Sequence, residues 1–410
     1  MRNILAAFFA ILALAGCAAQ GPPSARREVS AAPARPITIL ISIDGFRPDY
    51  LDRGATPNLS RLAAEGVRGE MRPSFPSKTF PNHYTLVTGL RPDRNGIVDN
   101  NMVDPAIPGV VFKMSNEAAV QDARWWDEAE PIWVSVEKTG RPTATLFWPG
   151  SEAAIHGVRP TRTAHYDETM ASAARVDQFL AWLDQPGARP AFGTLYFDVV
   201  DTAGHWYGPD SFQVNAAASD VDRAIGRLET GLKARGIAAN LVIVADHGMA
   251  ATSPDRRIFA DDLLSRADAR TLTMGPFWAL NPAPGREAAV AFALLRPHAH
   301  MQCWRKADIP ARFHYGRNPR VPAFFCLAQT GWEITTHDYR PSHPENGDHG
   351  YDNASPEMRA LFVAAGPAFR SHVRLKTFDN VDVYPLLADL LRVRPQPNDG
   401  RLSDLAPALR

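Results

Sequence analysis

Between residues 37 and 391 the chain keeps one order: short apolar runs alternate with stretches that have the apolar spacing of a helix. This alternation predicts a mostly parallel sheet covered by helices, because parallel neighbours need a long, usually helical, connection between them. The candidate strands are 37–43, 143–147, 193–199, 240–245 and 361–365. The candidate helices are 56–66, 81–90, 132–138, 171–183, 214–235, 288–295 and 381–391. We therefore expect an α/β core in which helices sandwich the sheet.

The N-terminus has the pattern of an export signal. An apolar run at 4–15 is too short to cross a bilayer comfortably and ends in Leu-Ala-Gly-Cys, which resembles a bacterial lipobox. This predicts removal of residues 1–16 and lipidation of Cys17, with plain cleavage after Ala19 as the alternative. No Asp follows Cys17. We therefore expect an exported, periplasmic protein that is lipid-anchored to the outer membrane.

Composition changes again after the signal. Residues 17–36 are rich in Ala, Pro and Ser, which suits a flexible tether. The catalytic domain is then expected to span 37–397. Within it, 91–189 has weaker periodicity, and we expect part of this range to form loops and a small inserted lid.

The charge balance restricts the kinds of partner that the chain can bind, and the cysteine content indicates its compartment. Lys plus Arg equals Asp plus Glu at 44 each, so the chain has no net field for a nucleic-acid polymer. A small phosphorylated substrate remains compatible, since metal ions can supply positive charge locally. Lipidation of Cys17 would leave Cys303 and Cys326, which predicts a disulfide in an oxidising compartment. Two free buried thiols are the alternative.

Candidate metal ligands gather in loops next to glycine. They are Asp44, Asp201, His205, Asp246, His247 and His349. Ligands of open α/β sheets bind beyond the carboxyl ends of the strands, and small neighbours let the backbone approach an ion. Mixed carboxylate and imidazole donors suit zinc better than magnesium or calcium, and six of them are enough for two ions. A single such Asp would more often be a helix cap; it is the combination that predicts a site.

A nucleophile for such a site lies in the segment 73–84. Thr79 comes just before a predicted helix start, where free N–H groups and the helix dipole favour an anion. Metal coordination can activate a hydroxyl. Ser74 and Ser77 are rivals on composition, and a simple helix cap is the structural alternative. Surface, capping or supporting roles are expected for the other histidines considered, which are His83, His298, His300, His337 and His343.

Together these motifs resemble the nucleotide pyrophosphatase/phosphodiesterases of the alkaline phosphatase superfamily, and most closely the bacterial nucleotide-cleaving members. The resemblance runs from about residue 37 to 391. Its markers, in chain order, are Ile-Asp-Gly at 43–45, Thr-Phe-Pro-Asn-His-Tyr at 79–84, Val-Thr-Gly-Leu at 87–90, Gly-Ile at 96–97, Glu-Pro-Ile-Trp at 130–133, Trp-Pro-Gly-Ser-Glu at 148–152, Asp201 with Gly-His at 204–205, Asp-His-Gly-Met at 246–249 and His-Gly-Tyr at 349–351.

The resemblance implies a fold, a reaction and roles for residues. It implies an alkaline-phosphatase-like core and cleavage of nucleotide phosphodiester and phosphoanhydride bonds to nucleoside 5'-monophosphates through a covalent threonine intermediate. One of two zinc ions would be held by Asp201, His205 and His349. The other would be held by Asp44, Asp246, His247 and the attacking Thr79.

The resemblance also implies how the substrate is bound. Asn100 would hold a phosphoryl oxygen, and Phe80, Tyr166 and Tyr196 would form the nucleoside slot. Ordinary core packing is the alternative for the two tyrosines. The chain departs from several animal members at Asn101, where they have Lys. A triphosphate preference that depends on that Lys is therefore not carried over.

Other activities remain as alternatives. A lysophospholipid or choline-ester phosphodiesterase would keep the same metal ligands, and phosphonate hydrolysis is a further option on the same fold. A phosphomonoesterase would be expected to carry a phosphate-clamping Arg, for which the sequence offers no clear candidate. A sulfatase would need a Cys-x-Pro-x-Arg segment, which does not occur. From a different class, a lipid-anchored binding protein with a dead site would lack bound metal.

Overall fold

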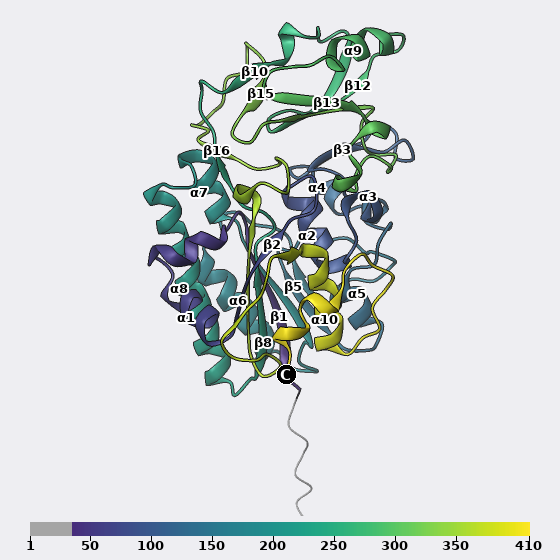
Figure 1. Ribbon diagram of the computed structural model, residues 1–410. Coiled ribbons are helices and arrows are strands. Elements are labelled where there is room, and N and C mark those ends of the chain that lie inside the picture. The colour runs from purple at the N-terminus through teal and green to yellow at the C-terminus, as the bar shows by residue number, and fades with distance from the viewer. Residues whose placement is uncertain (1–34) are drawn as a thin grey trace, which may run out of the picture. The chain divides into compact units, whose positions relative to one another are not determined.

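The five predicted strands all lie in one central sheet (Figure 1). They are β1 (Ile37–Ile43), β5 (Thr143–Leu146), β7 (Phe192–Phe197), β8 (Ala239–Val244) and β17 (Ala360–Ala365). The strand order is β18-β2-β17-β8-β1-β7-β5-β6, and β19 also pairs with β2. The added strands are β2 (Val67–Arg72), β6 (Arg162–Ala164), β18 (Val373–Arg374) and β19 (Phe378–Asp379).

The centre of this sheet is parallel, as the alternation of elements predicts. β1 pairs in parallel with β7 and β8, and β5 pairs in parallel with β7 and β6. β17 is antiparallel to both of its neighbours. Every residue of β1 is buried, since helices cover both faces, and this is why its sequence is a nearly unbroken apolar run.

Helices form two layers, and the predicted helices are confirmed to within a few residues. One layer contains α1 (Pro57–Glu65), α6 (Ser172–Asp184), α7 (Val199–Tyr207) and α8 (Phe212–Ala234). The other contains α2 (Thr79–Thr88), α5 (Ile132–Glu137) and α10 (Val383–Leu391), with the short α3 (Pro92–Asn95) beside α2. The predicted α/β sandwich is therefore confirmed. This computed structural model describes residues 35–410, so the predicted signal, Cys17 and most of the tether lie outside the described residues.

A second, smaller sheet was not predicted. It is antiparallel in the order β11-β12-β14-β13, and it is the green region at the top of Figure 1. Its strands are β11 (Ala269–Thr273), β12 (Phe277–Pro282), β13 (Met301–Arg305) and β14 (Phe324–Ala328), and it carries α9 (Glu287–Leu294). β11 and β13 are short and partly exposed, so their apolar patterns are weak, whereas β12 and β14 are mostly buried but only six and five residues long.

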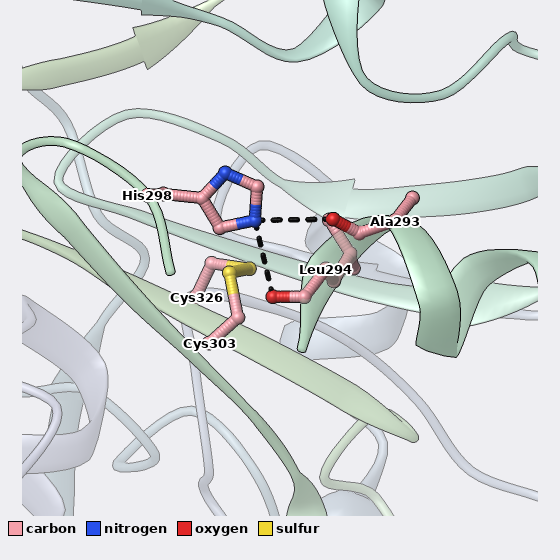
Figure 2. Close-up of a disulfide and its surroundings, with 5 residues drawn as sticks. All are labelled: Ala293, Leu294, His298, Cys303 and Cys326. Atoms are coloured by element: carbon pink, nitrogen blue, oxygen red, sulfur yellow. Dashed lines mark hydrogen bonds between the residues drawn. A yellow bond between two sulfur atoms is a disulfide. The ribbon is translucent and has the colours of Figure 1, made fainter. Parts of the chain in front are cut away.

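The small sheet contains a disulfide. Cys303 and Cys326 face each other across β13 and β14 and are bonded (Figure 2). The same view shows His298, whose Nε2–H donates to the carbonyls of Ala293 and Leu294 at 3.1 and 3.2 Å. These carbonyls lie at the end of α9, so His298 satisfies acceptors that the helix leaves free.

Three two-stranded pairings complete the fold. They are β3 (Asn101–Val103) with β4 (Val111–Lys113), β9 (Ala250–Ala251) with β16 (Gly347–Asp348), and β10 (Arg257–Phe259) with β15 (Glu333–Thr335). Residues 91–189 contain β3 and β4, the short α4 (Glu117–Val120), and also β5, β6 and α6 of the central layers. Among residues 35–410, no helix has the length and apolar character needed to cross a membrane.

Candidate active site

The six predicted ligand residues converge at one edge of the central sheet. β1 lies between β7 and β8, so the carboxyl ends of these three strands are adjacent. Asp44 follows β1, Asp246 and His247 follow β8, and helix α7 after β7 carries Asp201 and His205. His349 comes from far along the chain. The pairing of β16 with β9, which follows β8, brings it to the same edge.

Glycines make this close packing possible. Gly45 has φ +68°, and a Cβ there would meet the Oδ1 of Asp201 at 3.0 Å and its Cα at 3.1 Å. Gly347 allows a similar approach, because a Cβ there would meet the carbonyl oxygen of Gly204 at 2.5 Å. Both contacts lie between segments that carry candidate ligands, so side chains at these positions would push Asp44 from Asp201, or His349 from His205.

All three site histidines are oriented by backbone carbonyls. The Nδ1–H of His205 donates to Gly347 at 2.9 Å, that of His247 to Gly248 at 3.0 Å, and that of His349 to Ser77 at 2.8 Å. A carbonyl can only accept, so each ring keeps its proton on Nδ1 and presents the lone pair of Nε2.

The three Nε2 atoms face each other and the carboxylates. His349 Nε2 lies 3.1 Å from His205 Nε2, and His205 Nε2 lies 3.3 Å from Asp201 Oδ2. His247 Nε2 lies 2.9 Å from Asp246 Oδ2 and 3.4 Å from Asp44 Oδ1. The rings of His247 and His349 stack at 3.5 Å, so the two groups adjoin. Lone pairs directed at one another and at carboxylates repel, and a cation between them would relieve that repulsion.

Each carboxylate of the cluster also keeps one oxygen that has no hydrogen-bond donor among the described residues. Within residues 35–410, one buried oxygen on each of Asp44, Asp201 and Asp246 accepts no hydrogen bond. Burial, together with repulsion from Asp246 and Asp201, raises the pKa of Asp44 well above its ordinary value. Orphaned carboxylate oxygens beside imidazole lone pairs are what a transition-metal site requires, so the residues present fit a metal centre.

Thr79 lies beside this cluster and is the first residue of α2. The helix therefore begins two positions earlier than the predicted start at residue 81. Its hydroxyl is buried and lies 3.3 Å from His247 Nε2. Asn100 is adjacent: its Oδ1 accepts the N–H of Phe80 at 2.9 Å. This bond fixes the side-chain amide so that its NH₂ group remains a donor toward the cavity that Asn100 and Thr79 line.

His83 and the predicted aromatic residues lie around the cluster. His83 is fully buried near Asp44 and Asp246, but Ser42 Oγ at 2.8 Å and the Thr79 carbonyl at 2.9 Å engage both of its nitrogens. It therefore supports the site and is not free to act as a ligand.

The two tyrosines differ in exposure. Tyr196 is buried and donates its hydroxyl to Asp44 Oδ2 at 2.6 Å. Tyr166 is 46% exposed, with its ring centre 6.1 Å from that of Tyr196. Phe80 is partly buried against Phe112 and Trp126. An exposed ring beside the cluster suits a base-stacking role, whereas the Tyr196 hydroxyl acts on a candidate ligand.

Sequence reasoning missed several of the residues that line the cavity beside Thr79. Asp348 accepts the amide N–H of His349 at 2.6 Å and the Lys78 ammonium at 3.2 Å. Glu333 and Arg257 line the same cavity from β15 and β10. Lys78 and Asp348 each directly precede a predicted site residue, which is a signal that could have found them. Nothing in the local sequence of Glu333 or Arg257 indicates this position.

The sequence matches a known family over most of its length. Residues 38–352 match the family model for type I phosphodiesterase / nucleotide pyrophosphatase. The chain is 38% identical over 374 residues to bis(5'-adenosyl)-triphosphatase enpp4 of Xenopus laevis, covering 90% of this chain and 80% of that protein. It is 36% identical to ectonucleotide pyrophosphatase/phosphodiesterase family member 3 of Bos taurus, covering 92% of this chain and 44% of that longer protein.

Solved structures of relatives have the same fold as this chain. The murine ectonucleotide pyrophosphatase/phosphodiesterase 5, in an inactive threonine-to-alanine form complexed with AMP, superposes with a TM-score of 0.87 at 33% identity. The match covers 92% of this chain and all of that one. The human counterpart gives the same TM-score at 34% identity.

Proposed function

Because this chain belongs to the type I phosphodiesterase / nucleotide pyrophosphatase family, and is therefore a hydrolase, we propose that it cleaves nucleotide phosphodiester and phosphoanhydride bonds and releases nucleoside 5'-monophosphates. One observation carries the proposal: the buried Thr79 hydroxyl lies at the start of α2, 3.3 Å from His247 in a cluster of carboxylates and imidazoles. A nucleophile at a helix N-terminus beside a metal centre suits attack on a phosphoryl group.

Two zinc ions are the cofactor we propose. The Nε2 atoms of His205 and His349, with Asp201, would hold one ion, and His247, Asp44, Asp246 and Thr79 would hold the other. When bound, a pair of such ions supplies Lewis acidity to the attacking and leaving oxygens of an in-line displacement. Carboxylate plus imidazole donors with backbone-fixed tautomers favour zinc over magnesium or calcium.

Thr79 performs the displacement in two steps. Its Oγ, after losing its proton to solvent, forms a bond to phosphorus, and the bond from phosphorus to the leaving oxygen breaks with the electron pair on that oxygen. The nucleoside monophosphoryl group is then bonded to Thr79 Oγ. Water attacks phosphorus in the second step, the Oγ–P bond breaks, and Thr79 regains a proton. The AMP complex of the inactive threonine-to-alanine murine relative supports this assignment.

Asn100 and the first turn of α2 stabilise the charge that develops on phosphorus-bound oxygens. The Asn100 NH₂ group is directed by its bond to Phe80 N, so it is preorganised as a donor. We further propose that Phe80 and the exposed Tyr166 flank the nucleoside, with Tyr196 lining the slot while it holds Asp44.

The proposal is tested by comparing a diester with a monoester. Zinc-loaded protein lacking residues 1–17 is assayed with a nucleoside-monophosphate nitrophenyl ester, a choline ester and nitrophenyl phosphate. A strong preference for the nucleotide diester supports the proposal, whereas preference for the monoester or the choline ester would replace it by one of those activities. Thr79→Ala should abolish turnover while two zinc ions remain bound by elemental analysis. Near-native turnover in that variant would reject Thr79 as nucleophile.

We also propose that the protein is exported, with residues 1–16 removed and Cys17 lipidated at the outer membrane. The ecto-enzyme names of relatives support export. Mass spectrometry of the mature N-terminal peptide tests this: an unmodified peptide that starts after Ala19 would reject the lipid anchor.

A further inference from the structure

Tyr166, the exposed ring of the proposed nucleoside slot, lies in a loop whose residues are mostly exposed. The loop spans residues 165–171 and connects β6 to α6. Two carboxylates hold Tyr166 in place. Its amide N–H donates to Glu152 Oε1 at 3.0 Å, and its hydroxyl donates to Asp198 Oδ2 at 3.0 Å. The residue is therefore fixed at its backbone by one acid and at the far end of its ring by the other.

Arg175 connects Asp198 to the rest of this region. It lies in the first turn of α6 and is only 1% exposed. Its Nη1 donates to Asp198 Oδ1 at 2.6 Å and to the carbonyl of Tyr196 at 3.0 Å. Its Nε–H donates to the carbonyl of Met170 at 2.8 Å. One buried side chain thus joins the end of β7, the residue before α7 and the loop that carries Tyr166.

The effect of these contacts is mainly geometric. A guanidinium presents its N–H groups in a fixed fork, so acceptors bonded to it take up fixed positions relative to one another. A buried ion pair often adds nothing to stability compared with apolar packing of the same volume. Arg175 does, however, fix Asp198, whose second oxygen receives the Tyr166 hydroxyl. The guanidinium also lies 5.3 Å from the centre of the Phe147 ring, which meets the Tyr166 ring edge-on at 5.5 Å.

We propose that Arg175 is a positioning residue for nucleotide specificity, which acts through Asp198 to hold the Tyr166 ring where a nucleobase stacks. This inference rests on the proposed function and adds the residue that orders its nucleoside slot. Arg175 is buried and does not itself contact the substrate. Its loss should therefore weaken the preference for nucleotides and leave the displacement at Thr79 unchanged.

The test compares two diesters with the same leaving group, using the zinc-loaded protein. A nucleoside-monophosphate nitrophenyl ester offers a base to the slot, whereas methyl nitrophenyl phosphate offers none. Stacking of a base on an aromatic ring corresponds to about 5–100-fold in affinity. Arg175→Met should lower kcat/KM for the nucleotide ester at least about five-fold, through KM, and keep that for the methyl ester within about two-fold of wild type.

Arg320→Met is the matched control. Arg320 is also almost fully buried, at 3% exposed, and it pairs with Asp104 at 2.6 Å. Its guanidinium donates to the carbonyls of Gly96 and Trp125 at 2.8 and 2.7 Å, and neither residue belongs to the proposed nucleoside slot. Both variants lose a buried ion pair, so general destabilisation would affect both. The ratio of kcat/KM between the nucleotide ester and the methyl ester should change only in Arg175→Met.

Two more variants show whether Arg175 acts through Tyr166. Arg175→Lys keeps a cation beside Asp198, so it tests the proposal even if Arg175→Met does not fold. An ammonium cannot reproduce the fork, and loss of a carbonyl contact should lower the same ratio by about two-fold to five-fold. In a Tyr166→Ala background, which lacks the ring, neither substitution of Arg175 should lower the ratio further, because residues that act through one another are not additive.

The outcomes separate this inference from the proposed function. An unchanged ratio in the Arg175 variants, an equal change in Arg320→Met, or a further fall in the Tyr166→Ala background would overturn the role of Arg175. Loss of bound zinc in the Arg175 variants would also overturn it, because Arg175 would then support α7 and its candidate ligands. A wild type that cleaves both diesters equally well would overturn the inference alone. No cleavage of either diester would reject the proposed function itself.

Discussion

The hydrogen bond between Tyr196 and Asp44 gives a sharp test of the metal site. The Tyr196 hydroxyl donates to Asp44 Oδ2 at 2.6 Å, and the other oxygen of this buried carboxylate accepts no hydrogen bond from residues 35–410. Tyr196→Phe removes only the hydroxyl and keeps the ring that we propose lines the nucleoside slot. The change therefore separates the support of a ligand from the binding of the base.

The expected size follows from the charge and the burial of Asp44. A hydrogen bond to an ionised group contributes about 1.5–3 kcal/mol, and removing a residue that orients a metal ligand typically costs 10–100-fold in affinity. At about 1.4 kcal/mol per factor of ten, the two estimates agree. The Asp44 pKa is already raised, by burial and then by Asp246 and Asp201, and Tyr196 opposes that rise. Without the Tyr196 hydroxyl, the pKa of Asp44 rises further, and a proton competes more strongly with zinc for this carboxylate.

Zinc affinity is the quantity to measure, by competition with a chromophoric chelator at pH 7. We expect one of two zinc ions to bind about 10–100-fold more weakly to Tyr196→Phe. Tyr166→Phe is the matched control, because its hydroxyl donates to Asp198 Oδ2 at 3.0 Å and touches no candidate ligand. If Tyr196→Phe binds both ions within about two-fold of wild type, the hydrogen bond does not support a ligand and the reasoning fails.

Two further predictions concern stability. Burial raises the pKa of Asp382 to about 6, so the folded state binds this proton more tightly than the unfolded state. The free energy of unfolding should therefore fall as pH rises from about 4 to 6, by at most about 3 kcal/mol, and Asp382→Asn should lack this component. Urea titrations in chelator across that range measure the difference between the two proteins, and parallel curves would contradict it. Replacing both Cys303 and Cys326 by Ala opens a loop with a separation of 23 residues. The free energy of unfolding should then drop by about 3 kcal/mol at pH 7, and a drop below about 1 kcal/mol would show that the bond constrains the unfolded chain little.

Much of the core could be predicted from the sequence because its signals are local. A strand buried on both faces is mostly apolar, so the run at 37–43, which only Thr38 and Ser42 interrupt, predicts β1 residue for residue. The helix at 56–66 is bounded by a Pro in its first turn and a Gly at its end, and α1 has these limits within one residue. By contrast, β11 and β13 are short and partly exposed, so their patterns resemble those of loops.

The residue types of the candidate ligands also follow from the sequence, whereas the groups that orient these ligands do not. Asp44 and Asp246 directly follow apolar strands and stand next to glycine or histidine, a pattern visible in a single pass. The carbonyl of Ser77 that orients His349 is separated from it by 272 positions, and its residue type carries no signal because any residue offers a carbonyl.

The sequence by itself determined the sheet-and-helix core, the set of carboxylate and imidazole side chains, and a hydroxyl at the start of a helix. These depend on burial periodicity and on residue type, which are properties of short segments. The tertiary structure alone decided which nitrogen each histidine presents, that Tyr196 holds Asp44, and that Arg257 lines the cavity beside Thr79. For His205, His349 and Tyr196 the deciding contact joins positions 142, 272 and 152 residues apart, so the packed backbone chooses it and the local sequence does not. His247 is the exception, because the carbonyl that orients it belongs to the next residue, Gly248.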